Sequence, residues 1–253
     1  MSLSFRQSDI LEIASTDGRV TVEGLAERFG VTVQTIRRDL TELADAGKLD
    51  RVHGGAVLRS GVSNIGYEDR RALNADAKTR IAQTCAADIP DGASIFMNIG
   101  TSTEAVARQL LNHKNLLVVT NNMNVANILV ENPDCEIIMA GGVLRRTDGG
   151  LIGNLTVSAI RQFKFDIAVI GCSALDADGD LLDFDFQEVQ VSQAIIEKAR
   201  RTFLVADHSK FQRSAPARIG SIAELDTVYS DLPLPGKLPE HCREWQTDVV
   251  ICD

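Results

Sequence analysis

The sequence has no cysteine pair, no membrane-length apolar run and no excess of positive charge. Its five Cys are widely spaced and include no CxxC pair, so it indicates neither a disulfide framework nor a zinc module. Free buried thiols suit a reducing compartment, which favours the cytoplasm. No apolar stretch approaches the roughly 18 residues that a membrane span needs. Acidic residues also interrupt the N-terminal segment where a signal peptide would be apolar.

What is present is an ordinary globular composition with an acidic balance. Of 253 residues, 44% are hydrophobic and 24% charged, which argues against disorder, collagen or coiled coil as the main architecture. The length suggests one large domain or two smaller ones. A net charge of −9 opposes general coating of nucleic acid. Residues 1–60, however, hold eight basic and nine acidic residues, so a small DNA-binding module there is compatible with the charge.

Residues 1–60 have the pattern of three short helices. Apolar residues at helical spacing predict a first helix that stops at Gly18. Thr21 is expected to cap a second helix, which ends at Gly30. Thr32 is expected to cap a third helix from about Val33 to Ala46.

The second and third helices have helix-turn-helix spacing. In the third, Ile36, Leu40 and Leu43 recur on one face, so we expect them to be buried. The opposite face would present hydroxyl, amide and guanidinium groups, which bind base edges and phosphates in the major groove. A hairpin over Leu49–Val52 and Ala56–Leu58 would form a wing. The candidate DNA-contacting residues are Gln34, Thr35, Arg37, Arg38, Thr41, Arg51 and His53.

The same spacing also fits a solvated amphipathic helix with an ordinary mixture of charges. Asp39, Glu42 and Asp45 could pair with the arginines of that helix. Short helix-turn-helix signals are degenerate. Spacing alone therefore leaves both interpretations open.

Residues 61–73 are polar with two glycines, and we interpret them as a linker. From residue 74 to 253, short apolar runs alternate with helical stretches, which predicts an α/β domain with a mostly parallel sheet covered on both faces. The expected strands are Ser94–Ile99, Leu116–Thr120, Glu136–Met139, Asp166–Ile170, Thr202–Val205, Thr227–Ser230 and Asp248–Ile251. The expected helices are Ala75–Ala87, Thr103–Leu111, Val125–Val130, Val157–Gln162, Glu188–Ala199 and Glu240–Trp245.

Polar residues follow several of these expected strands. A Gly-Thr-Ser-Thr run at residues 100–103 opens a helix, where hydroxyls and free N–H groups bind anions, although a simple helix cap is the alternative. Asn121 follows the next strand, and Lys210, a compact cation suited to phosphate, follows a later one. Because ligands of open α/β sheets bind outside the carboxyl ends of the strands, we expect these loops to converge.

An acidic group, Asp183, Asp185 and Glu188, leads into an expected helix. Such carboxylates either stabilise the helix N-terminus or accept hydrogen bonds from a polyol. Gly141 and Gly142 allow close backbone approach, as does any simple turn.

Longer strings of the sequence resemble the DeoR family of bacterial transcriptional regulators. TVQTIRRDLTELADAGKLDRVHGGA is similar to the DNA-binding signature of that family. NIGTST, VTNNMNVAN, IIMAGGVLRRTDGGLIG, LLDFDFQEV and DHSKF occur in the order of its sensor domain. The resemblance covers the chain from about Phe5 to Tyr229. Within the family, the strings are most similar to members that respond to glycerol 3-phosphate.

The resemblance implies a winged helix-turn-helix domain (1–60) and a sensor domain (74–253) that resembles ribose-5-phosphate isomerases. It implies a repressor that binds double-stranded operator DNA as a homo-oligomer, dimer or tetramer, without a metal or redox cofactor. The implied effector is glycerol 3-phosphate, with another sugar phosphate as the alternative. The effector-binding residues that the resemblance implies are Gly100, Thr101, Ser102, Thr103, Asn121, Glu188 and Lys210.

Asn98 stands where family members often have Asp, so a role for that carboxylate is in doubt in this chain.

The isomerase likeness also raises an enzymatic alternative, a sugar-phosphate isomerase with Glu188 or Asp183 as the base. A helix-turn-helix would serve no purpose in a free isomerase, and fold does not fix function, so we expect a regulator rather than an enzyme.

Overall fold

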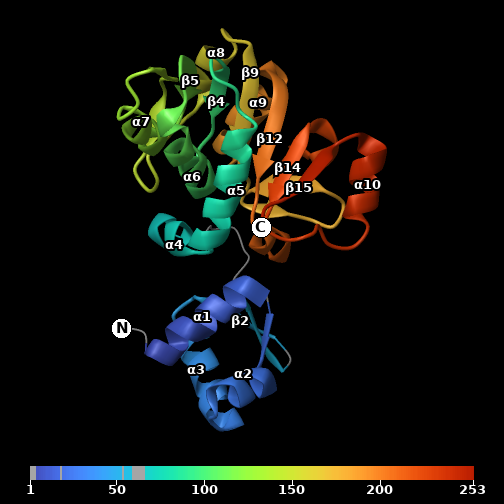
Figure 1. Ribbon diagram of the computed structural model, residues 1–253. Coiled ribbons are helices and arrows are strands. Elements are labelled where there is room, and N and C mark those ends of the chain that lie inside the picture. Colours follow the sequence, from blue (N-terminus) through green and yellow to red (C-terminus); the bar gives the residue numbers. More distant parts are fainter. Residues whose placement is uncertain (1–3, 18, 53, 59–65) are drawn as a thin grey trace.

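The computed structural model describes residues 4–17, 19–52, 54–58 and 66–253. Figure 1 shows a small N-terminal group of helices and a larger C-terminal part built around a sheet. The helices are α1 (Phe5–Asp17), α2 (Val22–Phe29), α3 (Val33–Asp45), α4 (Tyr67–Ala72), α5 (Ala75–Ala87), α6 (Thr101–Gln109), α7 (Met123–Leu129), α8 (Asn154–Ile160), α9 (Phe186–Lys198) and α10 (Leu238–Trp245), with 3-10 turns η1 (Leu110–Asn112), η2 (His208–Gln212) and η3 (Ile222–Glu224). Within the described residues, none of the helices has the length and apolar character needed to cross a membrane.

The strands of the described residues fall into four sheets. They are β1 (Arg19–Thr21), β2 (Leu49–Val52), β3 (Gly55–Leu58), β4 (Ser94–Met97), β5 (Leu116–Thr120), β6 (Cys135–Met139), β7 (Val143–Arg145), β8 (Gly150–Ile152), β9 (Phe165–Ile170), β10 (Ala174–Leu175), β11 (Asp180–Asp183), β12 (Ala199–Val205), β13 (Ala217–Ser221), β14 (Thr227–Ser230) and β15 (Asp248–Ile251).

The caps predicted for α2 and α3 are confirmed. The Thr21 hydroxyl accepts a hydrogen bond from the Gly24 N–H at 3.2 Å, and Gly30 ends α2 with a φ of 62°. The Thr32 hydroxyl accepts from the Thr35 N–H, also at 3.2 Å. Each hydroxyl satisfies an N–H group that has no partner within its helix. The predicted stop of α1 at Gly18 lies outside the described residues.

The buried face predicted for α3 is also confirmed, since Ile36, Leu40 and Leu43 are each 0% exposed. They pack with residues of α1 and α2 in a small apolar core. This core fixes which side of α3 faces outward.

The predicted hairpin forms, and a third strand joins it. Strand β3 pairs antiparallel with β2 on one side and with β1 on the other. A Cβ atom at Gly55 would lie 1.9 Å from the Val20 carbonyl oxygen, so only glycine allows β3 to approach β1 this closely. His53, one of the candidate DNA-contacting residues, lies outside the described residues.

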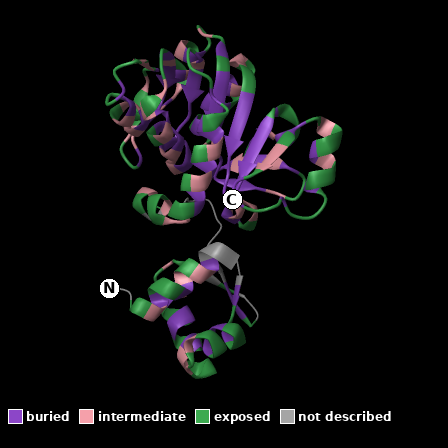
Figure 2. Cartoon of the chain, viewed as in Figure 1, coloured by how far each residue is buried: buried purple, intermediate pink, exposed green. Residues whose placement is uncertain are grey.

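The mostly parallel sheet is confirmed as a seven-stranded sheet with the order β15-β14-β12-β9-β4-β5-β6, in which every neighbouring pair is parallel. Figure 2 shows that its central strands are almost wholly buried. One apolar cluster joins the sheet to α5, α6 and α7, and a second joins it to α8, α9 and α10. Burial on both faces explains why these strands are continuous apolar runs in the sequence.

The strand order reverses between β4 and β9. Strands β5 and β6 lie beyond β4, whereas β12, β14 and β15 lie beyond β9. Such a reversal opens a crevice at the carboxyl ends of the strands, where open α/β sheets bind ligands. The loops after β4, β5, β9 and β12 all leave the sheet at this edge because the strands are parallel.

Several predicted boundaries were wrong by a few residues. Helices α6, α7, α8, α9 and α10 start two or three residues earlier than expected, because apolar periodicity locates the middle of a helix better than its first turn. Strand β4 ends at Met97 rather than Ile99, and β12 begins at Ala199 rather than Thr202. Helix α4 occupies residues 67–72, within the segment predicted as a linker. The antiparallel strands β10, β11 and β13 were not anticipated.

Replacing Leu40 tests the packing of the N-terminal part. Since Leu40 is 0% exposed, we expect Leu40→Ala to lower the free energy of unfolding there by about 2–5 kcal/mol. Val33 on the same helix is 36% exposed, so Val33→Ala should change it by less than about 0.5 kcal/mol. Hydrogen exchange of the α3 amides measures both. Equal losses of protection would contradict the burial pattern.

Candidate functional site

The outer face of α3 is open to solvent. Gln34, Arg37, Arg38 and Thr41 are exposed, and Thr35 is half-buried. An amide, two guanidiniums and a hydroxyl therefore stand on one side of a helix whose other side is buried. These groups can bind base edges or phosphates.

The acidic residues of α3 leave most of this face uncompensated. Asp39 is 5% exposed and pairs with Arg6 of α1, with 2.6 Å between Nε and Oδ2. The expectation that Asp39 could pair with the arginines of α3 is therefore wrong. Glu42 does pair with Arg38, at 3.0 Å, but both side chains are well exposed. An exposed pair at this spacing is weak, so DNA phosphates can displace Glu42 from Arg38.

The wing is attached to the same helix. The Arg51 Nη1 donates to the Arg37 carbonyl oxygen at 3.1 Å and to the Thr41 hydroxyl at 3.0 Å. The Thr41 hydroxyl in turn donates to the Arg37 carbonyl oxygen at 2.8 Å. Helix and wing thus present their cations as one connected surface.

The predicted anion loop forms the first turn of α6. Thr101 is half-buried, and its hydroxyl donates to the Arg70 carbonyl oxygen at 3.3 Å. Ser102 is 7% exposed and Thr103 0%. The Thr103 hydroxyl lies 2.7 Å from the carbonyl oxygens of Asn98 and Gly100, so it is used inside the fold. Of the three hydroxyls, that of Thr101 is the most exposed.

Two asparagines at this edge have different environments. The Asn98 amide donates to the Ser192 hydroxyl at 2.9 Å, and its Oδ1 accepts from the Ile99 N–H at 2.6 Å. A carboxylate could not make that donation. Asn121 is 0% exposed and donates to the Leu151 carbonyl oxygen at 3.1 Å. Its buried Oδ1 has no hydrogen-bond partner in the described part of the chain.

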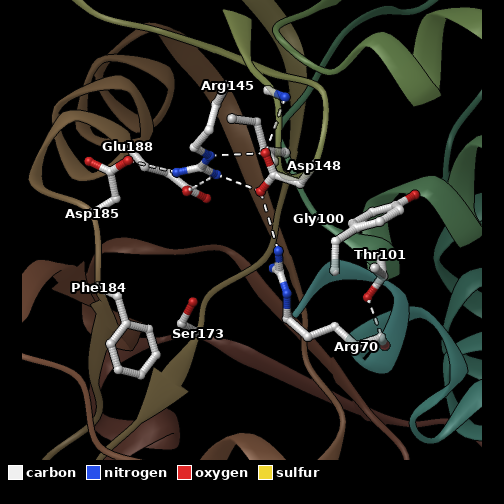
Figure 3. Close-up of polar contacts among 12 residues, drawn as sticks. Arg70, Gly100, Thr101, Arg145, Asp148, Ser173, Phe184, Asp185 and Glu188 are labelled. Carbon is white, nitrogen blue, oxygen red and sulfur yellow. Dashed lines mark hydrogen bonds and ion pairs between the residues drawn. The ribbon is translucent and has the colours of Figure 1, made fainter. Parts of the chain in front are cut away.

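Carboxylates converge on Arg145, which the sequence analysis did not single out (Figure 3). Its Nε and Nη2 donate to the two oxygens of Asp148 at 2.9 and 2.7 Å. Nη1 donates to Asp185 at 2.7 Å and Nη2 to Glu188 at 2.5 Å. The Asp185 side chain also caps α9 by accepting from the Gln187 N–H at 2.8 Å. The helix-stabilising role expected for Asp185 is therefore confirmed.

Asp183 adds a further carboxyl to this group. It is 4% exposed and accepts from the Ser173 hydroxyl at 3.0 Å. Burial and the charge of Asp183 raise the pKa of Glu188 to about 8, although Arg145 opposes the shift. Burial likewise raises the pKa of Asp183. Among the described residues, no group of acidic, His or Cys side chains is arranged to hold a metal ion.

Four cations lie close enough to interact electrostatically: Arg70 of α4, Lys78 of α5, Lys210 of η2 and Arg213, which follows η2. Burial and the charge of Arg213 lower the pKa of Lys210, and Arg70 adds to this effect. Burial, reinforced by the three other cations, lowers the pKa of Lys78 to about 8. Asp207 interacts electrostatically with Lys78, Lys210 and Arg213. It is 1% exposed, and Lys210 helps to hold its pKa low despite burial. Positive charge therefore exceeds negative charge here.

Arg213 has buried donors that an anion could satisfy. The residue is 9% exposed, and its Nε and Nη2 atoms are buried without a hydrogen-bond partner in the described parts of the chain. Leaving a buried charged donor unsatisfied costs more than the same loss for a neutral group. An incoming anion would remove that cost.

Five of these residues were not predicted from the sequence. Arg145 and Asp148 stood within a quoted family string but had no assigned role. Arg70 fell in the predicted linker. Lys78 and Arg213 had only their charge as a signal, and their partners are distant in sequence.

Two family models match this chain. A DeoR-like helix-turn-helix domain matches residues 6–61, and a DeoR C-terminal sensor domain matches residues 73–232. The chain belongs to the DeoR family of transcriptional regulators.

Full-length relatives agree with this assignment. The chain is 46% identical to the glycerol-3-phosphate regulon repressor of Escherichia coli K12, with 100% of both chains covered. It is 45% identical to the repressor of that name from Haemophilus influenzae, covering 100% of this chain and 98% of the relative. The HTH-type transcriptional repressor CsqR of Escherichia coli is 37% identical, with 97% and 94% covered. The chain is a DNA-binding transcriptional repressor rather than an enzyme.

Solved structures show weaker likeness. Ribose 5-phosphate isomerase A from Methanocaldococcus jannaschii aligns with a TM-score of 0.41 at 14% identity, over 55% of each chain. The eIF2B beta subunit from Chaetomium thermophilum aligns with a TM-score of 0.46 at 14% identity, over 61% of this chain and 48% of that one.

Replacing Arg38 tests the outer face of α3. Its side chain is 83% exposed, so Arg38→Ala should not affect folding. If Arg38 reads a base, operator affinity should fall by about 1–3 kcal/mol, measured by gel shift. Arg28→Ala, on exposed α2 surface, is the control for a general loss of positive charge. An unchanged operator affinity for Arg38→Ala would refute its assignment.

The raised pKa of Glu188 predicts a pH dependence of stability. The folded protein keeps the proton on Glu188 up to about pH 8, whereas the unfolded chain releases it near pH 4.5. The contribution of protonated Glu188 to the free energy of unfolding is therefore complete below pH 4.5. It is lost as the pH rises from there toward 8, by at most about 1.4 kcal/mol per pH unit. Thermal unfolding between pH 5.5 and 8 should show a smaller decline in Glu188→Gln than in wild type. Glu197→Gln, exposed on the same helix, should follow wild type.

Proposed function

We propose that this repressor holds operator DNA through α3 and the wing, and that glycerol 3-phosphate releases it by binding at the carboxyl edge of the sheet. The observation that supports the ligand is the polarity of that edge. Cations exceed carboxylates around Arg213 and Lys210, whereas carboxyls exceed cations around Arg145. A molecule with a dianion at one end and hydroxyls at the other matches both halves.

Each half has a defined task in this proposal. Buried guanidinium and ammonium groups form charge-assisted hydrogen bonds with phosphate. The Thr101 hydroxyl and the free N–H groups of the first turn of α6 add donors from a helix N-terminus. Carboxylates near Glu188 accept hydrogen bonds from the hydroxyls of the polyol. An acidic protein needs such local donors, since its overall field repels a dianion.

The relatives support the choice of ligand. Repressors named for the glycerol-3-phosphate regulon share 45–46% identity with this chain over its full length. The ligand must bind the DNA-releasing state more tightly than the DNA-holding state, because only differential affinity shifts a population. We further propose a homo-oligomer that places two recognition helices on repeated half-sites. We place this oligomer in the cytoplasm, with the DNA.

Titration of operator-bound protein tests the proposal. Glycerol 3-phosphate should release the DNA and glycerol should not, because the phosphate provides the charge-assisted bonds. Lys210→Gln should weaken the response at least tenfold. Lys114→Gln, at an exposed lysine paired with Asp134 near the opposite ends of the strands, should respond like wild type. Release by fructose 6-phosphate or ribose 5-phosphate alone would keep the phosphate site and reject glycerol 3-phosphate. No release by any of them would reject the site.

A further inference from the structure

Arg70 makes weak use of its donors. Its Nη2 lies 3.2 Å from the Asp148 Oδ2, whereas Arg145 holds both oxygens of that carboxylate at 2.7 and 2.9 Å. The Arg70 Nε is buried and has no hydrogen-bond partner among the described residues. A guanidinium offers five donors in a planar fork. Arg70 is therefore a poorly satisfied cation that shares a carboxylate already engaged by another arginine (Figure 3).

The surroundings of Arg70 favour an anion. Lys78, Lys210 and Arg213 are close enough to interact with it electrostatically. The side chain of Arg70 is only 17% exposed, so water screens this repulsion less than at the surface. Its carbonyl oxygen meanwhile accepts from the Thr101 hydroxyl and the Lys78 ammonium. Arg70 thus lies between the first turn of α6 and the cationic group.

Among the described residues, helix α4, which contains Arg70, is also the first element that follows the DNA-binding part. Strand β3 ends at Leu58 and α4 begins at Tyr67. Side chains of the sensor domain hold α4 in place. The Tyr67 hydroxyl donates to Glu104 at 2.8 Å, and Asn124 donates to both Glu104 and the Tyr67 oxygen at 3.1 Å. A change at Arg70 therefore acts on the segment that leads to α3 and the wing.

We propose that Arg70 is an effector-binding residue, and that a bound phosphate replaces Asp148 as its principal partner. The exchange gives the buried guanidinium a dianion with several oxygens in place of a single shared contact. It shifts α4 relative to the sheet edge and thereby couples the ligand to the DNA-binding part. This inference rests on the proposed function, and it adds both a binding residue and the route by which binding is transmitted.

The test compares Arg70→Gln, Arg70→Lys and Arg71→Gln in the full-length protein. Arg71 is the next residue of α4 and is exposed, so it controls for charge and helix position. Calorimetry measures binding of glycerol 3-phosphate, gel shift measures operator release, and hydrogen exchange follows the α4 amides. Wild type should change its α4 exchange on binding. Arg70→Gln should bind at least tenfold more weakly, and at saturating ligand it should show less operator release and a smaller change in α4.

The variants also distinguish binding from mere support of the fold. Arg70→Lys keeps the charge but loses the fork, so it should bind better than Arg70→Gln and still worse than Arg71→Gln. The thermal stability of all three should match, because Asp148 keeps its bonds to Arg145. If Arg70→Gln bound and released like Arg71→Gln while Lys210→Gln lost its response, the exchange would be refuted and the proposed function would stand. If wild type itself gave no response, the proposed function would fail first.

Discussion

The common direction of seven parallel strands is the constraint on which the rest of this structure depends. Because β4, β5, β9 and β12 run the same way, the loops after them meet at one edge. Polar residues that are up to about a hundred positions apart in the sequence are thereby placed together, on a scaffold whose two faces are buried. The reversal of strand order between β4 and β9 leaves the edge open at that point. No local sequence feature could gather these charges without that topology.

The electrostatics of the carboxyl edge of the sheet follow from the many charged groups buried close together there. Burial disfavours every charged group, so each must find a partner or shift its pKa. On one side, Arg145 satisfies several carboxylates, yet Glu188 still holds its proton to about pH 8. On the other side Asp207 partly compensates several cations, and Arg213 keeps buried donors without partners. The two imbalances have opposite sign and meet where Arg70 contacts Asp148.

Much of the fold could be predicted because its signals are local. All seven strands of the parallel sheet contain short apolar runs, and Thr21, Gly30 and Thr32 marked helix ends through chemistry that acts within a few residues. Strands β10 and β11 were missed because they are short and follow no long apolar run.

The candidate site could be predicted only in part, because its signals are not local in the sequence. Thr101 and Lys210 follow strands and could be found by their position. Arg70 and Arg213 are ordinary charged residues in polar segments. Their importance depends on partners such as Asp148 and Asp207, which topology alone brings near. Thr103 was assigned to the ligand, but its hydroxyl is used within the fold.

Asp148 contacts both Arg70 and Arg145, and this shared carboxylate helps to stabilise the ligand-free protein. Without that carboxylate, Arg70 would be a largely buried cation close to Lys78, Lys210 and Arg213. With a stronger partner, such as a bidentate carboxylate of its own, Arg70 would gain nothing from a phosphate. A single contact at 3.2 Å lies between these limits. Because binding free energies are reciprocal, operator DNA must then weaken effector binding by the factor by which effector weakens DNA binding. A poorly satisfied arginine on α4, which lies between the DNA-binding part and the sensor sheet in the sequence, allows both effects to act through one residue.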